Sequence, residues 1–151
     1  MTFYSGQNGR LLIDDVAAAK VTTWAISSSQ TPLDCTTLEQ TDKTYVNGLR
    51  NTTGSCRIFY YDDTSGSTRT NSAKTLIDKL MKARTTGSAA GIAADPQNVT
   101  LKLQVVEGTA TTRTIEVEAL ITAAAMQMAV GQVLAADIQF QVNGAPKTVA
   151  L

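Results

Sequence analysis

The sequence predicts a mainly β fold of the α+β class, with two sheets packed face to face as a sandwich or closed into a flattened barrel. Residues 98–108 and 136–142 alternate apolar and polar side chains with the period of a strand, whereas residues 72–84 repeat with helical period. Such strands bury one face each, which a two-layer arrangement with the helix on one flank achieves. The 151 residues are assigned to one domain, 1–151, long enough to bury a core.

The N-terminal part is expected to form a hairpin. Residues 9–13 are a short apolar strand, and Asp14 and Asp15 are plausible turn residues. Residues 18–28 would be its second strand. That segment is apolar or β-branched on both faces, which suits a central strand.

Residues 30–50 are expected to form a long polar loop. Pro32 argues against a regular strand at its start, and Gly48 indicates a turn or a close backbone approach near its end. A loop of this length inside a compact domain is usually functional or disordered. A dense strand signal follows at residues 52–61.

One helix is predicted over residues 72–84. Asn71 or Ser72 can cap its N-terminus, since a short side-chain oxygen accepts a hydrogen bond from a first-turn N–H. Its apolar positions form one stripe for burial. They are Leu76, Ile77, Leu80 and Met81.

The C-terminal half is a predicted meander of strands. Residues 98–108 and 112–122 each have one apolar and one polar face. The Ala- and Met-rich residues 123–130 are interpreted as strand despite their helix propensity. After a strand ending near Val142, a turn at Asn143–Gly144 either returns the chain as a short last strand or lets it trail away.

Composition excludes several function classes. The net charge is zero, with 13 basic and 13 acidic residues, so no bulk electrostatic case exists for binding nucleic acid or an anionic membrane. Histidine is absent, which removes His-based triads and the commonest metal sites. No nucleotide-binding or nucleophile-elbow motif occurs. The chain is therefore expected not to be an enzyme and to carry no cofactor or metal.

The remaining reactive residues have ordinary interpretations. Cys35 and Cys56 have no CxxC partner and are expected to be free thiols in a reducing compartment. The pairs Asp14–Asp15 and Asp62–Asp63 are interpreted as solvated turns rather than catalytic carboxylates. No apolar run reaches the roughly 18 residues of a membrane helix, and the N-terminus has no signal-peptide pattern.

The polar strand faces point toward self-association. They are rich in Thr, Gln and Glu and poor in Lys. Edge strands of soluble monomers are usually protected by Lys or Pro against pairing with other chains. Weakly protected edges are what we expect if they meet other copies.

Three blocks of the sequence carry a resemblance to a known family. They are GQNGRLLIDDVAAAKVTTWAISSSQTPLDCTTL, then KTYVNGLRNTTGSCRIFYYDD, then VGQVLAADIQFQVNGAPK. In their order and spacing, over nearly the whole chain, they resemble the major tail tube proteins of long-tailed, siphovirus-like bacteriophages. That family is similar in fold to the tube-forming hemolysin-coregulated proteins of type VI secretion.

The resemblance implies a structural subunit of the virion tail, made in the host cytoplasm. Its copies would form hexameric rings, with strands joined into one barrel around a channel, and the rings would stack into a tube through which DNA is ejected. Expected partners are other copies, a tape measure protein, a tail terminator and a baseplate, with double-stranded DNA passing without specific binding and no membrane involved.

The resemblance also implies a role for the 30–50 loop, which would reach a neighbouring subunit or ring. The residues expected to make that contact are Leu33, Asp34, Leu38, Tyr45 and Leu49. The alternative is a surface Ω-loop folded on its own domain.

A channel for DNA favours carboxylates and amides, because a Lys/Arg lining would bind phosphates. The candidates, all on polar strand faces, are Gln104, Glu116, Glu118, Asp137, Gln139 and Gln141. The sequence leaves open which of these faces lines the channel.

Other functions remain as alternatives. One is a related single-ring component, such as a tail terminator, or a type VI secretion-like tube protein. Another is a monomeric β-sandwich binding module, for example for carbohydrate. The one Trp, four Tyr and three Phe lie mostly at positions expected to be buried, which disfavours a stacking surface for sugars.

Overall fold

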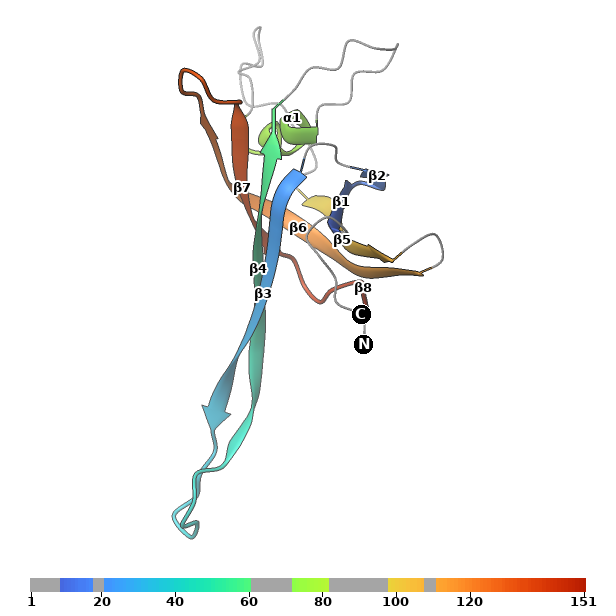
Figure 1. Ribbon diagram of the computed structural model, residues 1–151. Helices are drawn as coiled ribbons and strands as arrows, with labels where there is room; N and C mark the ends of the chain where they lie inside the picture. The colour runs from blue at the N-terminus through green and yellow to red at the C-terminus, as the bar shows by residue number, and fades with distance from the viewer. Residues whose placement is uncertain (1–8, 18–20, 61–71, 82–97, 108–110) are drawn as a thin grey trace, which may run out of the picture.

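Strands dominate the computed structural model, which describes residues 9–17, 21–60, 72–81, 98–107 and 111–151. Eight strands in these ranges belong to one antiparallel sheet, ordered β2-β1-β5-β6-β7-β4-β3, with β8 beside β6 (Figure 1). The elements are β1 (Gly9–Ile13), β2 (Val16–Ala17), β3 (Val21–Asp34), β4 (Tyr45–Phe59), α1 (Ser72–Ile77), β5 (Asn98–Glu107), β6 (Thr111–Gln127), β7 (Ala135–Val142) and β8 (Thr148–Ala150).

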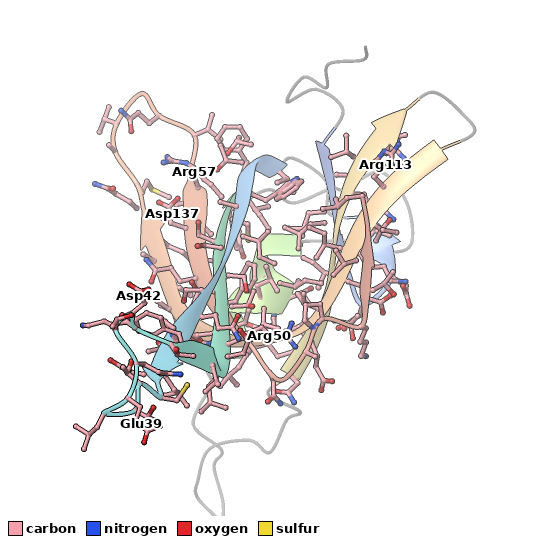
Figure 2. The ribbon with its side chains drawn as sticks, turned by 90° about the horizontal axis from the view of Figure 1, so that it is seen from below. Glu39, Asp42, Arg50, Arg57, Arg113 and Asp137 are labelled. Atoms are coloured by element: carbon pink, nitrogen blue, oxygen red, sulfur yellow. The ribbon has the colours of Figure 1, made fainter. Side chains whose placement is uncertain are left out.

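The sheet folds into two facing layers because β6 belongs to both. The N-terminal half of β6 pairs with β5 and β8, and its C-terminal half pairs with β7. A register shift between Ile121 and Ala123 marks the change. Viewed along the molecule, one layer holds β1, β5 and β6 and the other holds β7, β4 and β3, with side chains filling the space between (Figure 2). The predicted β fold is confirmed, and its two layers form one continuous sheet.

The core lies between the layers and follows the predicted alternation. Val99, Leu101 and Leu103 of β5 are buried against Ile138 and Phe140 of β7 in one apolar cluster. Each buried side chain of this size contributes roughly 1.5–3 kcal/mol relative to exposure. The core therefore depends on strands from both halves of the sequence.

The helix is shorter than predicted. It spans Ser72–Ile77, and residues 78–81 continue as turns. Leu76 and Ile77 are buried in the core, whereas Leu80 and Met81 are 45% and 54% exposed. The last turn tightens, with Leu80 N donating to Ile77 O at 3.0 Å. With only one turn finding a buried surface, little tertiary packing extends the helix. Residues 71 and 82–84 of the prediction lie outside the described residues.

The predicted hairpin of residues 9–13 with 18–28 is wrong. β1 pairs with β2 through the two-residue turn Asp14–Asp15, where φ is 48° and 67°. Such a turn, with both central residues at positive φ, reverses the chain at once. β5 occupies the other edge of β1, and β3 joins the opposite layer by pairing with β4.

The predicted polar loop at residues 30–50 is also wrong over most of its length. β3 and β4 continue as a paired hairpin, and only residues 35–44 connect them. Pro32 is tolerated because β3 is an edge strand and the register shifts between Gln30 and Pro32.

The C-terminus does return as a strand. Gly144, at φ 79°, supports the turn, and β8 pairs with residues 114–116 of β6. The 123–130 segment is strand as far as Gln127. In the part of the chain described, no helix has the length and apolarity to cross a membrane.

Candidate assembly surfaces

The distal part of the β3–β4 hairpin, residues 29–50, projects beyond the rest of the molecule, and we call it the arm (Figure 1). Within the described ranges no second layer covers it, and every residue in it is exposed except Gly48, which is half-buried. It contains all five residues that the sequence proposed for an inter-subunit contact.

The arm presents apolar side chains to solvent on both of its faces. Leu38 is fully exposed at the tip and Leu49 is 91% exposed. Leu33 and Val46 oppose each other across the ladder, and Tyr45 lies opposite Asp34. Because successive residues of a strand point to opposite faces, Val46 and Tyr45 are on different sides. Val46 is a further apolar group exposed on the arm that sequence reasoning did not name, although its alternation with Tyr45 would have indicated it had the segment been read as strand.

The tip of the arm is organised by its own polar groups. The Asp34 carboxylate accepts hydrogen bonds from Thr36 N at 2.9 Å and Thr36 Oγ1 at 2.6 Å. These bonds from Thr36, side chain first, lower the pKa of Asp34. Thr44 N donates to Thr36 Oγ1 at 3.0 Å. Asp34 is thus used in the turn, which leaves Leu38 as the protruding group.

A close backbone approach holds the middle of the arm. A Cβ on Gly48 would lie 2.0 Å from Thr31 O, so only glycine fits there. Gln30 Nε2 donates to Gly48 O at 3.0 Å. The predicted close approach at Gly48 is confirmed, and it coincides with the register shift that accommodates Pro32.

The six channel candidates divide between the two outer faces of the sheet. Asp137, Gln139 and Gln141 lie on β7, facing away from the core beside β4; we call this the β7 face. Arg57 and Asp137 form a half-exposed ion pair at 3.7 Å (Figure 2). Gln141 Nε2 donates to Thr52 O at 3.1 Å and also contacts Asn51. The β7 face is thus polar with its charges paired.

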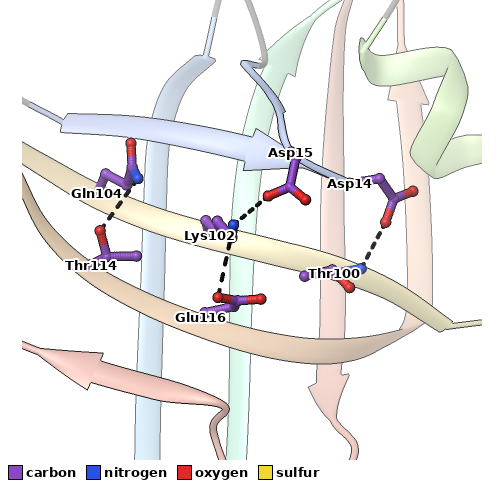
Figure 3. Close-up of polar contacts among 7 residues, drawn as sticks. All are labelled: Asp14, Asp15, Thr100, Lys102, Gln104, Thr114 and Glu116. Carbon is purple, nitrogen blue, oxygen red and sulfur yellow. Dashed lines mark hydrogen bonds and ion pairs between the residues drawn. The ribbon is translucent and has the colours of Figure 1, made fainter.

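Gln104, Glu116 and Glu118 lie on the other layer, on what we call the β5 face. Gln104 Nε2 donates to Thr114 Oγ1 at 3.3 Å, and Lys102 contacts both Asp15 and Glu116 (Figure 3). The hydrogen bond to Asp15 raises the pKa of Lys102. In Figure 3 these contacts lie on the side of β5 and β6 away from β3, β4 and β7. One channel wall therefore cannot contain all six candidates.

The layer formed by β3, β4, β7 and the C-terminal half of β6 has two free edges. β3 ends the sheet order, and β5 pairs with β6 only as far as Leu120, so within the described ranges residues 121–127 have no partner opposite β7. No charged residue lies on the β3 edge from Val21 to Leu33 or on the β6 edge from Ile121 to Gln127. Uncharged free edges are templates for pairing with another chain.

The described residues include carboxylates and two thiols, which are side chains that can bind metal ions. Among them, no group of three or more His, Cys, Asp or Glu side chains could hold a metal ion. Both cysteines are free thiols, as predicted, with Cys35 exposed and Cys56 buried. Burial, and then the Asp137 carboxylate, raise the pKa of Cys56 to about 12, which keeps it protonated and unreactive.

Comparison with known proteins identifies the fold. No family model and no curated protein matches the sequence. A chain from the tail of an empty gene transfer agent particle with C6 symmetry is similar, with a TM-score of 0.60, 13% identity and coverage of 97% of this chain and 98% of that one. The SPP1 tail tube protein gives a TM-score of 0.62 at 12% identity, over 93% of this chain and 76% of that one.

The chain has the fold of phage tail tube proteins. This chain is also similar to a chain from the tube-terminating cap of the anti-feeding prophage, with a TM-score of 0.64, 8% identity and coverage of 95% of this chain and 89% of that one. The predicted resemblance is confirmed at the level of the fold. The two free edges and the arm are observed in the structure of this chain itself.

Proposed function

We propose that this protein is the structural subunit of a virion tail tube, not an enzyme. The observation that carries the proposal is the four-stranded layer with two uncharged free edges, together with the tail tube fold. An exposed pair of such edges on a monomer would be an aggregation hazard. In a closed ring both edges are paired and the hazard disappears.

Strand direction favours a ring. Three antiparallel pairings separate β6 from β3, so the two free edges run in opposite directions. If neighbouring copies are related by rotation about an axis parallel to these strands, β3 of one copy lies antiparallel to β6 of the next. This head-to-tail contact repeats until the ring closes. Six copies are proposed, by analogy with the C6 symmetry of the gene transfer agent tail.

The ring assigns the β7 face to the channel. The opposite side of that layer is covered by β1, β5 and the N-terminal half of β6, which would form the outer wall. Asp137, Gln139 and Gln141 would line the channel, and Gln104, Glu116 and Glu118 would face outward. Amides, hydroxyls and a paired arginine offer passing DNA few phosphate contacts, so the polymer can slide without specific binding.

The arm supplies the contact between rings. It extends along the strand direction past its own body and exposes apolar groups on both faces, as expected of a strand pair that a partner covers on both sides. Leu33, Leu38, Tyr45 and Leu49 would be buried there, with Asp34 holding the tip. In the virion tail, after synthesis in the host cytoplasm, the tube would meet a tape measure protein, a terminator and a baseplate.

The likeness to the tube-terminating cap favours one other function, a single-ring terminator. Negative-stain electron microscopy of the purified protein over a concentration series separates the two. We expect stacked rings with a central hole. Single rings that never stack would favour the terminator, and particles of one copy at every concentration would contradict both.

A matched variant tests the role of the arm. Replacing residues 32–47 with Asn-Gly closes the hairpin with a two-residue turn and removes Leu33, Leu38 and Tyr45, while Leu49 is kept. We expect this variant to form single rings, because its free edges are intact. Stacked tubes from this variant would show that the arm is not the contact between rings.

A further inference from the structure

A groove of about 720 Å³ opens where the arm leaves the body. Segments of both layers line it, and its apolar side chains are Ile26, Leu49, Ile115, Val142, Ala145, Pro146 and Val149. Arg50 is the one charged residue among those lining it, and it lies between the two layers when the molecule is viewed along the arm (Figure 2). The groove has the size and apolar lining of a site that takes a small group of side chains.

The groove is left open by the described residues. Leu49 and Val149 are 91% and 61% exposed although both line it. Exposed apolar surface of this kind marks an interaction site. A binding segment must be apolar and narrow, because the groove walls apart from Arg50 are uncharged and a charge buried against them without a partner would be costly.

The 128–134 loop between β6 and β7 has these properties. Its sequence, MAVGQVL, is uncharged. Met128, Val130 and Val133 are 75%, 107% and 66% exposed. Gly131, at φ 82°, and a hydrogen bond from Gln132 N to Ala129 O at 3.1 Å form a tight turn that carries Val130 at its apex. The turn is formed before any partner arrives, so little ordering cost accompanies docking.

The loop and the groove cannot meet within one copy. The loop lies at the end of the molecule opposite the arm, whereas the groove opens on the side toward the arm (Figure 1). A second copy displaced along the arm direction brings its loop to the groove of the first. The tip of the arm is the poorer occupant, because Glu39, Asp42 and Lys43 surround its single apolar group, Leu38.

We propose that the 128–134 loop of one copy docks into this groove of a copy in the next ring, with Val130 inserted between Leu49 and Pro146. The inference rests on the proposed tube. It adds a second contact between rings. The body of one copy receives the loop of a copy in the next ring, and the arm of the first copy passes beside that second copy. Together the two contacts would bury the exposed apolar side chains at both ends of the subunit.

Disulfide formation between two separately labelled copies tests the contact. Val130→Cys and Ala145→Cys are made in a Cys35→Ser background, mixed, assembled, oxidised gently and pelleted as tubes. We expect a covalent dimer containing one copy of each variant. Arg10→Cys, an exposed site on β1 in the other layer, replaces Ala145→Cys in the control and should give no dimer.

Each result decides between the inference and the function on which it rests. Pelleted tubes without the Val130–Ala145 dimer would overturn the docking alone. A failure of every variant and the wild-type protein to pellet would overturn the tube itself, and the docking with it.

A charge in the loop provides an independent test. Val130→Asp should reduce pelleted tube at least tenfold, whereas Ser55→Asp, which adds the same charge at an exposed position of β4 outside both the loop and the groove, should reduce it much less. Equal effects of the two substitutions would also overturn the docking.

Discussion

Gly54 and Phe140 are packed so closely on neighbouring strands that a Cβ on Gly54 would lie 2.3 Å from Cζ of Phe140. The same Cβ would lie 2.6 Å from Ala25 O, which is backbone and cannot rotate away. Phe140 is 1% exposed at the centre of the core. Glycine at this position therefore lets the largest buried side chain reach β4.

Gly54→Ala should destabilise the protein by about 1–3 kcal/mol, the usual cost of overpacking a core. Urea unfolding of the unassembled protein measures it as a lower midpoint at unchanged slope. Ser55→Ala, at the exposed neighbouring position, should stay within about 0.5 kcal/mol of wild type. Equal midpoints for the two variants would contradict the proposed packing.

Cys56 should make stability fall in alkaline solution. Its pKa is about 12 in the folded protein and ordinarily 9.0, so between these values the folded state holds a proton that the unfolded state loses. Stability then falls as pH rises above about 9, by at most about 1.4 kcal/mol per pH unit. The stability of wild type relative to Cys56→Ala, measured by urea unfolding from pH 8 to 11, should decrease accordingly. A difference between the two proteins that does not change over this pH range would contradict the burial of the Cys56 thiol.

Leu38→Asp should leave the subunit stable and prevent stacking. Leu38 is fully exposed, so its replacement should change unfolding by less than about 0.5 kcal/mol. In stacked rings the added carboxylate would be buried against apolar groups. Sedimentation velocity should show rings without tubes. Thr37→Asp places the same charge one residue away, and tubes lost equally in both variants would indicate a general charge effect.

Gln139→Lys and Gln104→Lys distinguish the two outer faces. Each adds one cation per copy, the first on the β7 face proposed for the channel and the second on the β5 face. Assembled Gln139→Lys tubes should retain double-stranded DNA in the channel, with affinity that falls steeply as salt rises. Nuclease treatment measures it, because DNA inside the tube is protected. Protection by Gln104→Lys tubes instead would reverse the assignment of the faces.

The sequence predicted the body of the fold well where one strand face is buried. β5 and β7 alternate cleanly because Leu101 and Ile138 meet the core while Lys102 and Gln139 do not. The arm was not predicted as strand, for the opposite reason. Both of its faces are exposed in a single copy, so no alternation marks it, and Pro32 is compatible with strand only because β3 lies at an edge.

The assembly surfaces depend on contacts that no local pattern contains. The groove combines Ile26, Ile115 and Pro146, which are far apart in the chain. Within the described ranges, residues 121–127 form a free edge because the pairing of β5 with β6 reaches only to Leu120. The apolar residues proposed for the arm contact were predicted as isolated apolar positions within a polar segment, but their shared location on the arm required the β3–β4 register.

β6 gives the subunit a mechanical property. Its 17 residues run without interruption from one layer into the other. In a tube, outward pressure from the contents would load the inner wall, and β6 would transmit that load to the outer wall through covalent backbone rather than through side-chain packing alone. The hydrogen bonds from β6 to β5 and β7 would then be loaded together in shear. The tube wall should therefore fail at the contacts between copies before any subunit unfolds.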